Sequence, residues 1–130
     1  MKKIKIIIER SKDGYFWGYA ESDRLSITGG GETVQACKDD ILACIEVLKE
    51  IDQFPYGDGE YELVYKYDME SLLNYYKKIF TLASLERITG VDQKYLQHYS
   101  TGLKKPRQER RKKIEASLHK LGSELMALEL

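Results

Sequence analysis

A short stretch of polar side chains after Val91 could read the edges of DNA bases. Its members recur at helical spacing, so a helix through them would carry all of them on one outer face. In the major groove, glutamine pairs bidentately with adenine and lysine donates to guanine. Asp92 precedes the stretch and is a favourable N-cap, because its carboxylate accepts backbone N–H groups of the first turn. We therefore predict a base-reading helix that begins at Asp92, with these side chains exposed on it: Gln93, Lys94, Gln97 and His98.

A basic segment follows this helix and could contact the DNA backbone. Its first cations are Lys104, Lys105 and Arg107. Contacts to phosphate set the register of a protein on the duplex, and each weakens as salt rises because binding releases counterions. The alternative is that residues 104–113 form an ordinary solvated helix face, as basic runs often do. Their place beside the predicted base-reading helix favours phosphate contact.

Two short helices joined by a tight turn must position these side chains. Residues 80–103 place apolar side chains at the spacing that holds two such helices together, which is the pattern of a helix-turn-helix. Gly90 supplies the positive φ that a short turn often needs. One such domain reads only a few base pairs, so we expect a homodimer or higher homo-oligomer on an inverted repeat in double-stranded operator DNA. The apolar positions are Leu85, Ile88, Val91, Leu96 and Tyr99.

Further helices are expected on both sides of this pair. Asp68 is a favourable cap for a preceding helix that reaches Phe80. Pro106 suits the first turn of a following helix, and Gly122 is expected to end it. Residues 123–130 then read as a last short helix, with apolar side chains that could pack on the bundle or on a second subunit: Leu125, Met126 and Leu128.

The charge distribution divides the chain of 130 residues into two parts. Residues 1–67 hold nine Lys and Arg against thirteen Asp and Glu, so their formal charge is 9 − 13 = −4. Residues 68–130 hold twelve against eight, so theirs is 12 − 8 = +4. We therefore expect two domains, 1–67 and 68–130, of which the basic one faces a polyanion. No stretch approaches the apolar length of a membrane span, and we expect a cytoplasmic protein without a membrane partner.

The acidic part is expected to be an α+β domain in which three strands precede a helix and a fourth strand follows. Asp13 and Gly14 form a strong hairpin signal between the first two strands, 3–9 and 15–20. Alternation along the second strand puts Trp17 and Tyr19 on the face opposite Phe16, where exposed aromatic side chains would mark an interaction surface. The remaining elements are a strand at 25–28, a Gly29–Gly31 turn, a helix at 33–51 capped by Thr33, and a strand at 61–67.

Catalysis has little support in the residues. Glu9, Asp13, Asp39 and Asp40 are the candidate metal-binding carboxylates, but Asp39 and Asp40 are adjacent on a helix and point apart, and Asp13 suits its turn. Cys37 and Cys44 are about 10 Å apart along a helix, which is too far for a disulfide bond. No nucleophile, base and orienting group come together. We expect no enzyme activity, no metal and no cofactor.

The whole chain resembles the HicB family of antitoxins. The N-terminal part is similar in DGYFWGY and in GETVQACKDDILACIEV, and the C-terminal part resembles lambda-repressor or Xre-type regulators in TGVDQKYL and STGLKKP. Glu86 stands where that helix pair usually has a small residue. The resemblance implies a truncated RNase H-like domain followed by a small all-α helix-turn-helix domain.

In function, the resemblance implies the antitoxin of a type II toxin–antitoxin system. Such a protein binds and blocks a small HicA-like ribonuclease toxin and represses its own operon. The sequence does not indicate which residues contact the toxin. The alternative is a free-standing transcription regulator whose N-terminal domain senses a ligand or a protein.

Overall fold

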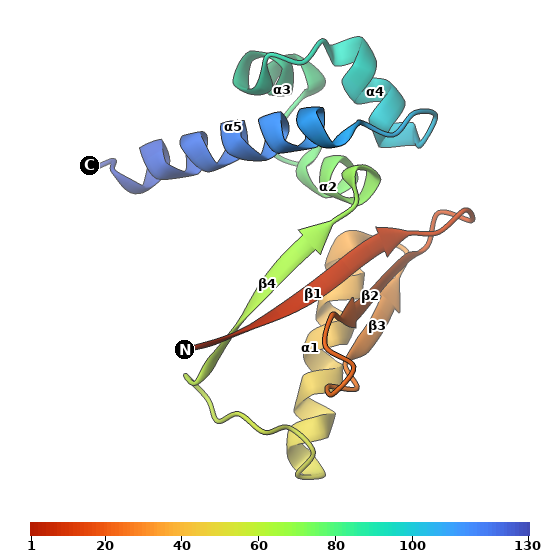
Figure 1. Cartoon of the computed structure of the whole chain (residues 1–130), viewed down its shortest axis with the longest axis vertical. Coiled ribbons are helices and arrows are strands. Elements are labelled where there is room, and N and C mark those ends of the chain that lie inside the picture. Colours follow the sequence, from red (N-terminus) through yellow and green to blue (C-terminus); the bar gives the residue numbers. More distant parts are fainter. The chain divides into compact units, whose positions relative to one another are not determined.

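The protein is a mixed α+β structure with a four-stranded sheet and five helices (Figure 1). This computed structural model describes all residues, 1–130. The chain forms two compact units, Met1–Tyr75 (unit 1) and Tyr76–Leu130 (unit 2). The division lies eight residues after the expected boundary at Tyr67, because the helix that follows contacts unit 1: Glu70 pairs with Arg10 at 3.4 Å, and the ring of Tyr75 lies 4.7 Å from the ammonium of Lys38.

The sheet of unit 1 has the strand order β3-β2-β1-β4. Its strands are β1 (Lys2–Arg10), β2 (Phe16–Ala20), β3 (Thr28–Gly31) and β4 (Tyr61–Tyr67). β1 and β2 form the expected antiparallel hairpin, in which Arg10 lies opposite Phe16. The turn depends on Gly14, whose φ is 87°, and on Asp13, whose carboxylate accepts the N–H of Tyr15 at 3.0 Å. β4 runs parallel to β1, so the helix between β3 and β4 makes a crossover.

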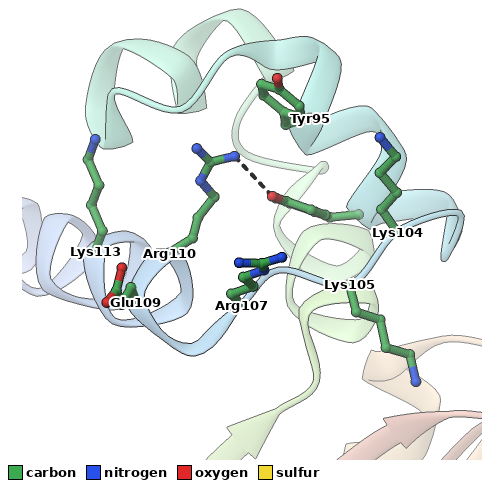
Figure 2. Close-up of a pocket in the computed structure, with 8 residues that line it drawn as sticks. Tyr95, Lys104, Lys105, Arg107, Glu109, Arg110 and Lys113 are labelled. Carbon is green, nitrogen blue, oxygen red and sulfur yellow. Dashed lines mark hydrogen bonds between the residues drawn. The ribbon is translucent and has the colours of Figure 1, made fainter.

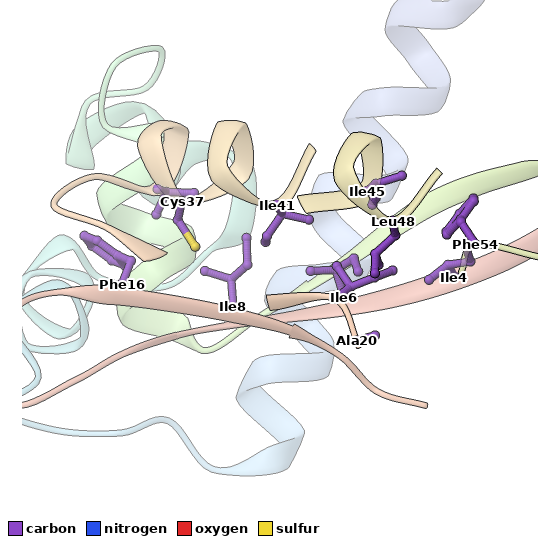
Figure 3. Close-up of a cluster of buried hydrophobic side chains, with 12 residues drawn as sticks. Ile4, Ile6, Ile8, Phe16, Ala20, Cys37, Ile41, Ile45, Leu48 and Phe54 are labelled. Carbon is purple, nitrogen blue, oxygen red and sulfur yellow. The ribbon is translucent and has the colours of Figure 1, made fainter. Parts of the chain in front are cut away.

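Helix α1 (Val34–Glu50) covers one face of this sheet. The hydroxyl of Thr33 accepts the N–H of Ala36 at 3.0 Å and caps the helix, as the sequence predicts. The apolar side of α1 meets the inward-facing isoleucines of β1 in a continuous core (Figure 3). The buried residues of α1 are Val34, Cys37, Ile41, Ile45 and Leu48.

The three glycines after Thr28 form a strand, which corrects two expectations. The sequence pattern placed the third strand at 25–28 and a turn at Gly29–Gly31, but the glycines themselves are β3, paired with β2. A Cβ on Gly29 would lie 2.8 Å from the backbone N of Ile41, and one on Gly31 would lie 2.7 Å from that of Cys37. Only glycine therefore lets this strand approach the backbone of α1 so closely.

The expected alternation along β2 is confirmed. Phe16 and Ala20 are buried against α1, whereas Trp17 is 54% exposed and Tyr19 is 38% exposed on the other face of the sheet. The rings of Tyr15 and Trp17 lie 4.8 Å apart. Unit 1 therefore has one apolar face that is packed and one that carries aromatic side chains in solvent.

The remaining helices are α2 (Met69–Tyr76), α3 (Leu82–Thr89), α4 (Gln93–Thr101) and α5 (Gln108–Met126). Asp68 caps α2 by accepting the N–H of Ser71 at 2.8 Å. In unit 2, α3 packs against both α4 and α5. The buried residues between these helices are Leu85, Thr89, Val91, Leu96, Tyr99 and Ile114.

Three boundaries differ from the sequence prediction. α2 stops at Tyr76 and does not reach Phe80, and Ile79 beyond it is 70% exposed. Pro106 lies before the N-cap residue Arg107, so it is not in the first turn of α5. α5 continues through Gly122 to Met126 without a separate last helix, because a glycine inside a helix costs only about 1 kcal/mol and helix-forming residues flank it.

None of the helices has the length and the apolar composition that crossing a membrane would require.

Candidate nucleic-acid interface

The turn between α3 and α4 is held by backbone geometry and by two carboxylates. Gly90 ends α3 in the left-handed conformation, with φ at 73°. Asp92 accepts the N–H of Lys94 at 2.7 Å, which confirms it as the cap of α4. Glu86 of α3 accepts the N–H of Gln93 at 2.9 Å. Glu86 thus joins the two helices by a hydrogen bond where a small residue would join them by close packing.

Three of the four predicted base-reading side chains lie on the outer side of α4. Gln93, Lys94 and Gln97 are exposed, whereas His98 is half-buried. The Nδ1 atom of His98 is buried without a hydrogen-bond partner, so the ring can present only its other nitrogen to a ligand. Tyr95, which the sequence analysis did not single out, is 43% exposed on the same helix.

The predicted phosphate-contacting residues are exposed and belong to a larger cationic cleft (Figure 2). The cleft has a volume of about 590 Å³ and lies between α4 and the start of α5. The sequence analysis included Arg110 and Lys113 only as members of the basic run 104–113, although the spacing of Arg107, Arg110 and Lys113 by three residues places them on neighbouring turns of one helix. The lining residues are Tyr95, Tyr99, Lys104, Lys105, Arg107, Glu109, Arg110 and Lys113.

Arg110 is held in the cleft by two tyrosines of α4. Its Nη1 donates to the hydroxyl of Tyr99 at 3.1 Å, the interaction drawn as a dashed line in Figure 2. Its guanidinium carbon lies 5.0 Å from the centroid of the Tyr95 ring, within cation–π range. The five cations of the cleft form no ion pair with a carboxylate. The cleft is therefore a preformed site of positive charge.

The carboxylates considered for metal binding do not come together. Tyr19 donates to Glu9 at 2.9 Å, Gln35 donates to Asp39 at 2.9 Å, and the N–H of Gly30 donates to Asp40 at 2.9 Å. Hydrogen bonds from Ser11 and from the backbone of Tyr15 lower the pKa of Asp13. No three His, Cys, Asp or Glu side chains are grouped so that they could hold a metal ion. Each of these acids has a local structural partner.

The two cysteines are free and lie in different surroundings. Cys37 is fully buried in the core, and burial, together with the negative charge of Asp40, raises the pKa of its thiol from 9.0 to about 11. Cys44 is half-buried, with its Sγ 3.6 Å from the carbonyl oxygen of Ser26. Burial and a raised pKa both make Cys37 a packing residue without nucleophilic character at neutral pH.

A second hollow of about 650 Å³ lies in unit 1 at the start of β1. Lys2, Lys3, Lys5 and Arg24 line it together with Tyr56. Lys5 pairs with Glu21 across it at 3.6 Å. This hollow concentrates positive charge within a unit whose total charge is negative.

Comparison of the chain with protein-family models, with curated proteins and with solved structures finds no match.

Proposed function

We propose that this chain is the antitoxin of a type II HicAB toxin–antitoxin system, which neutralises a small mRNA-cleaving toxin by direct binding and represses its own operon through unit 2. The observation that carries the proposal is the arrangement of α3, Gly90 and α4 beside the cationic cleft. It combines an outward polar helix face with unpaired cations next to it. A helix-turn-helix on DNA needs both features, one for bases and one for phosphates.

Unit 2 would dock with α4 in the major groove. Gln93 and Gln97 would pair with adenines, and Lys94 would donate to guanine. Lys104, Lys105 and Arg107 would contact phosphates and set the register. Two copies on an inverted repeat would double the number of base pairs that are read.

Unit 1 would bind the toxin. It holds nine Lys and Arg against fifteen Asp and Glu, so its formal charge is 9 − 15 = −6, whereas unit 2 holds twelve against six, which gives 12 − 6 = +6. A toxin that cleaves mRNA carries a basic surface, and an acidic partner is attracted to such a surface. The support for this assignment is the charge of unit 1, its strand order and the resemblance in DGYFWGY.

Two experiments test the proposal. Affinity purification of the chain expressed from its native operon should yield a small basic protein in fixed stoichiometry, identified by mass spectrometry. If the chain is recovered alone with the operon intact, the antitoxin function is refuted. Fluorescence anisotropy with a labelled duplex from the DNA upstream of the gene tests the DNA binding that repression requires.

Paired variants make the DNA experiment specific. Gln93→Ala and Gln97→Ala should each weaken binding to the upstream duplex about tenfold, because a bidentate base contact is worth about 1–3 kcal/mol. The same change at the exposed Gln53 of unit 1 is the control and should have no effect. Equal affinity of all three variants and the unaltered chain would exclude α4 as the base-reading helix.

A free-standing transcription regulator is the second candidate, and the hollow in unit 1 favours it. Lys2, Lys3, Lys5 and Arg24 could hold a small anionic effector. Under this alternative, the chain would bind the upstream duplex without any protein partner, and inorganic phosphate would change that affinity. Lys3→Gln would then abolish the response to phosphate and leave binding without phosphate unchanged.

A further inference from the structure

The cationic cleft of unit 2 concentrates like charges that the fold leaves uncompensated. Five cations and a single carboxylate, Glu109, line it, which gives 5 − 1 = +4. Lys49 of unit 1, by contrast, is paired with carboxylates: its ammonium lies 3.2 Å from Glu46 and 2.9 Å from Asp58. Holding unpaired like charges together costs free energy, and an anion in the cleft would offset that cost. The site therefore suits an anionic ligand.

Arg110 is the best-positioned donor in the cleft. One of its N–H groups is used by the hydroxyl of Tyr99, and the ring of Tyr95 lies against its guanidinium. A guanidinium has five N–H donors, so several remain for a ligand. Because the side chain is already held, binding costs less conformational entropy than it would for a free arginine. Tyr99 is thus a positioning residue for Arg110.

The spacing of the cations suits a chain of phosphates. Arg107, Arg110 and Lys113 are spaced by three residues and span about 9 Å along the start of α5. Successive phosphates of one DNA strand rise by about 3.4 Å along the duplex axis but lie about twice as far apart through space, because the strand winds round that axis, so two of them match this length. The exposed Gln93, Lys94 and Gln97 lie on α4, the helix that forms the other wall of the cleft. The cleft therefore adjoins the helix that is proposed to read the bases.

We propose that the cleft between α4 and α5 binds DNA backbone phosphates, with Arg110 and Lys113 as phosphate-binding residues in addition to those of the preceding loop. This inference rests on the proposed binding of DNA by unit 2. It selects Arg110 and Lys113 from the basic run 104–113 as two further contacts. It also gives the means by which Arg110 is held ready for a ligand, through Tyr99 and Tyr95.

The test compares cleft residues with neighbours of the same charge outside it. Arg110 and Lys113 line the cleft, whereas the adjacent Arg111 and Lys112 are exposed and do not. Affinity for the labelled upstream duplex is measured for R110Q, R111Q, K113Q and K112Q over a range of salt concentrations. R110Q and R111Q have the same net charge, as do K113Q and K112Q, so a general effect of charge is equal within each pair. Thermal melting checks that each variant is folded.

We expect R110Q and K113Q each to reduce the slope of log K against log salt by about 1, as the loss of one phosphate contact does. R111Q and K112Q should leave the slope close to that of the unaltered chain. Arg110→Lys should restore most of the slope. Tyr99→Phe, which keeps the ring and removes the hydroxyl, should lower the affinity less than R110Q and leave the slope unchanged, because it frees Arg110 without removing its charge.

The outcomes distinguish failure of the cleft proposal from failure of the proposed DNA binding by unit 2. If the unaltered chain binds the duplex with a steep salt dependence and the cleft variants match their outward controls, the cleft proposal is overturned and DNA binding stands. If the unaltered chain does not bind the duplex even at low salt, both proposals fail. A titration with inorganic pyrophosphate distinguishes the source of the phosphate. Binding of pyrophosphate that R110Q abolishes, without any difference on the duplex, would assign the cleft to a free anion and overturn the assignment to DNA.

Discussion

In unit 1, Lys5, Arg10 and Lys49 form ion pairs with carboxylates, whereas none of the cations in the cleft of unit 2 does. Lys49 illustrates the first arrangement: hydrogen bonds with Tyr61 and with the carboxylate of Asp58 raise the pKa of its ammonium group. Arg110 illustrates the second, since its partners in the fold are two tyrosines and no carboxylate. A cation with a carboxylate partner loses part of that interaction when a phosphate approaches. A cation held by a neutral partner keeps its full charge for the ligand.

The two units also differ in their cores. The core of unit 1 joins a helix and a sheet through twelve buried residues. That of unit 2 lies between short helices, and its buried apolar residues are Leu85, Val91, Leu96, Tyr99 and Ile114. A small core leaves little stability in reserve, so one deletion should unfold unit 2 while unit 1 stays folded.

Of the variants considered, Leu96→Ala should change the difference in stability between the two units most. Leu96 is fully buried, and removing its side chain should cost about 2–5 kcal/mol of the stability of unit 2. Trp17 is the only tryptophan and lies in unit 1, so its fluorescence reports on that unit alone. In a urea titration, the part of the helical circular dichroism signal that comes from unit 2 should be lost earlier, ahead of the part from α1, while the midpoint of Trp17 fluorescence stays in place. An equal shift of both midpoints would show that the units unfold as one.

Gly31→Ala should destabilise unit 1 through overpacking. The new Cβ would lie 2.7 Å from the backbone N of Cys37, and neither strand nor helix can retreat without disturbing the core. We expect a loss of about 1–3 kcal/mol, measured as an earlier midpoint of Trp17 fluorescence in urea.

The same substitution in unit 2 is the control for this prediction. A Cβ on Gly122 would meet nothing within 4 Å, and alanine favours a helix over glycine by about 1 kcal/mol. Gly122→Ala should therefore stabilise α5, with the opposite sign from Gly31→Ala. A loss of stability at both positions would mean that Gly122 has a contact that the fold does not reveal.

Both glycines were assigned wrongly from the sequence, whereas other elements of the fold were predicted correctly. The helix α1, the β1–β2 hairpin and the caps Thr33 and Asp92 follow from local spacing and local hydrogen bonds, and all were predicted. Gly29–Gly31 was misread because its role depends on a close approach of α1, a contact made only after folding. Gly122 was misread because tertiary context outweighs the modest cost of a glycine inside a helix.

In the candidate site too, the features set by local spacing were predicted, and those set by contacts between helices were not. Gln93, Lys94 and Gln97 were placed correctly on the exposed face by helical period alone. Arg110 and Lys113 could not be singled out from the basic run 104–113, because the cleft is made by two helices whose proximity the sequence does not state. His98 was expected outside, but at the end of α4 it is half-buried, since the helix turns that position toward the interior.

Asp92→Ala tests how firmly α4 is held at its first turn. The substitution removes the acceptor for the N–H of Lys94 and should cost about 1 kcal/mol, measured by the dichroism signal in urea. Glu86 still accepts the N–H of Gln93, so the loss should stay below that of Leu96→Ala. Asp92→Asn keeps an acceptor oxygen and should restore most of the stability. If Asn and Ala behave alike, the carboxylate acts by its charge on the helix and not as a cap.

The last prediction concerns the thiol of Cys37 in unit 1, whose effect on stability appears only at alkaline pH. At pH 8, a thiol reagent should label Cys44 quickly and Cys37 only as fast as unit 1 opens, because Cys37 is buried and its pKa is raised to about 11.

The sign of the pH dependence of stability follows from the raised pKa of Cys37. Above pH 9 the thiol ionises in the unfolded chain, whereas in the folded unit it stays protonated until about pH 11, so rising pH favours unfolding across that window. Cys37→Ala removes this contribution, so the stability difference between the unaltered chain and the variant, measured by Trp17 fluorescence, should narrow from pH 8 to pH 11. A difference that stays constant over that range would mean that the thiol ionises equally in both states and that its burial in the core is incomplete.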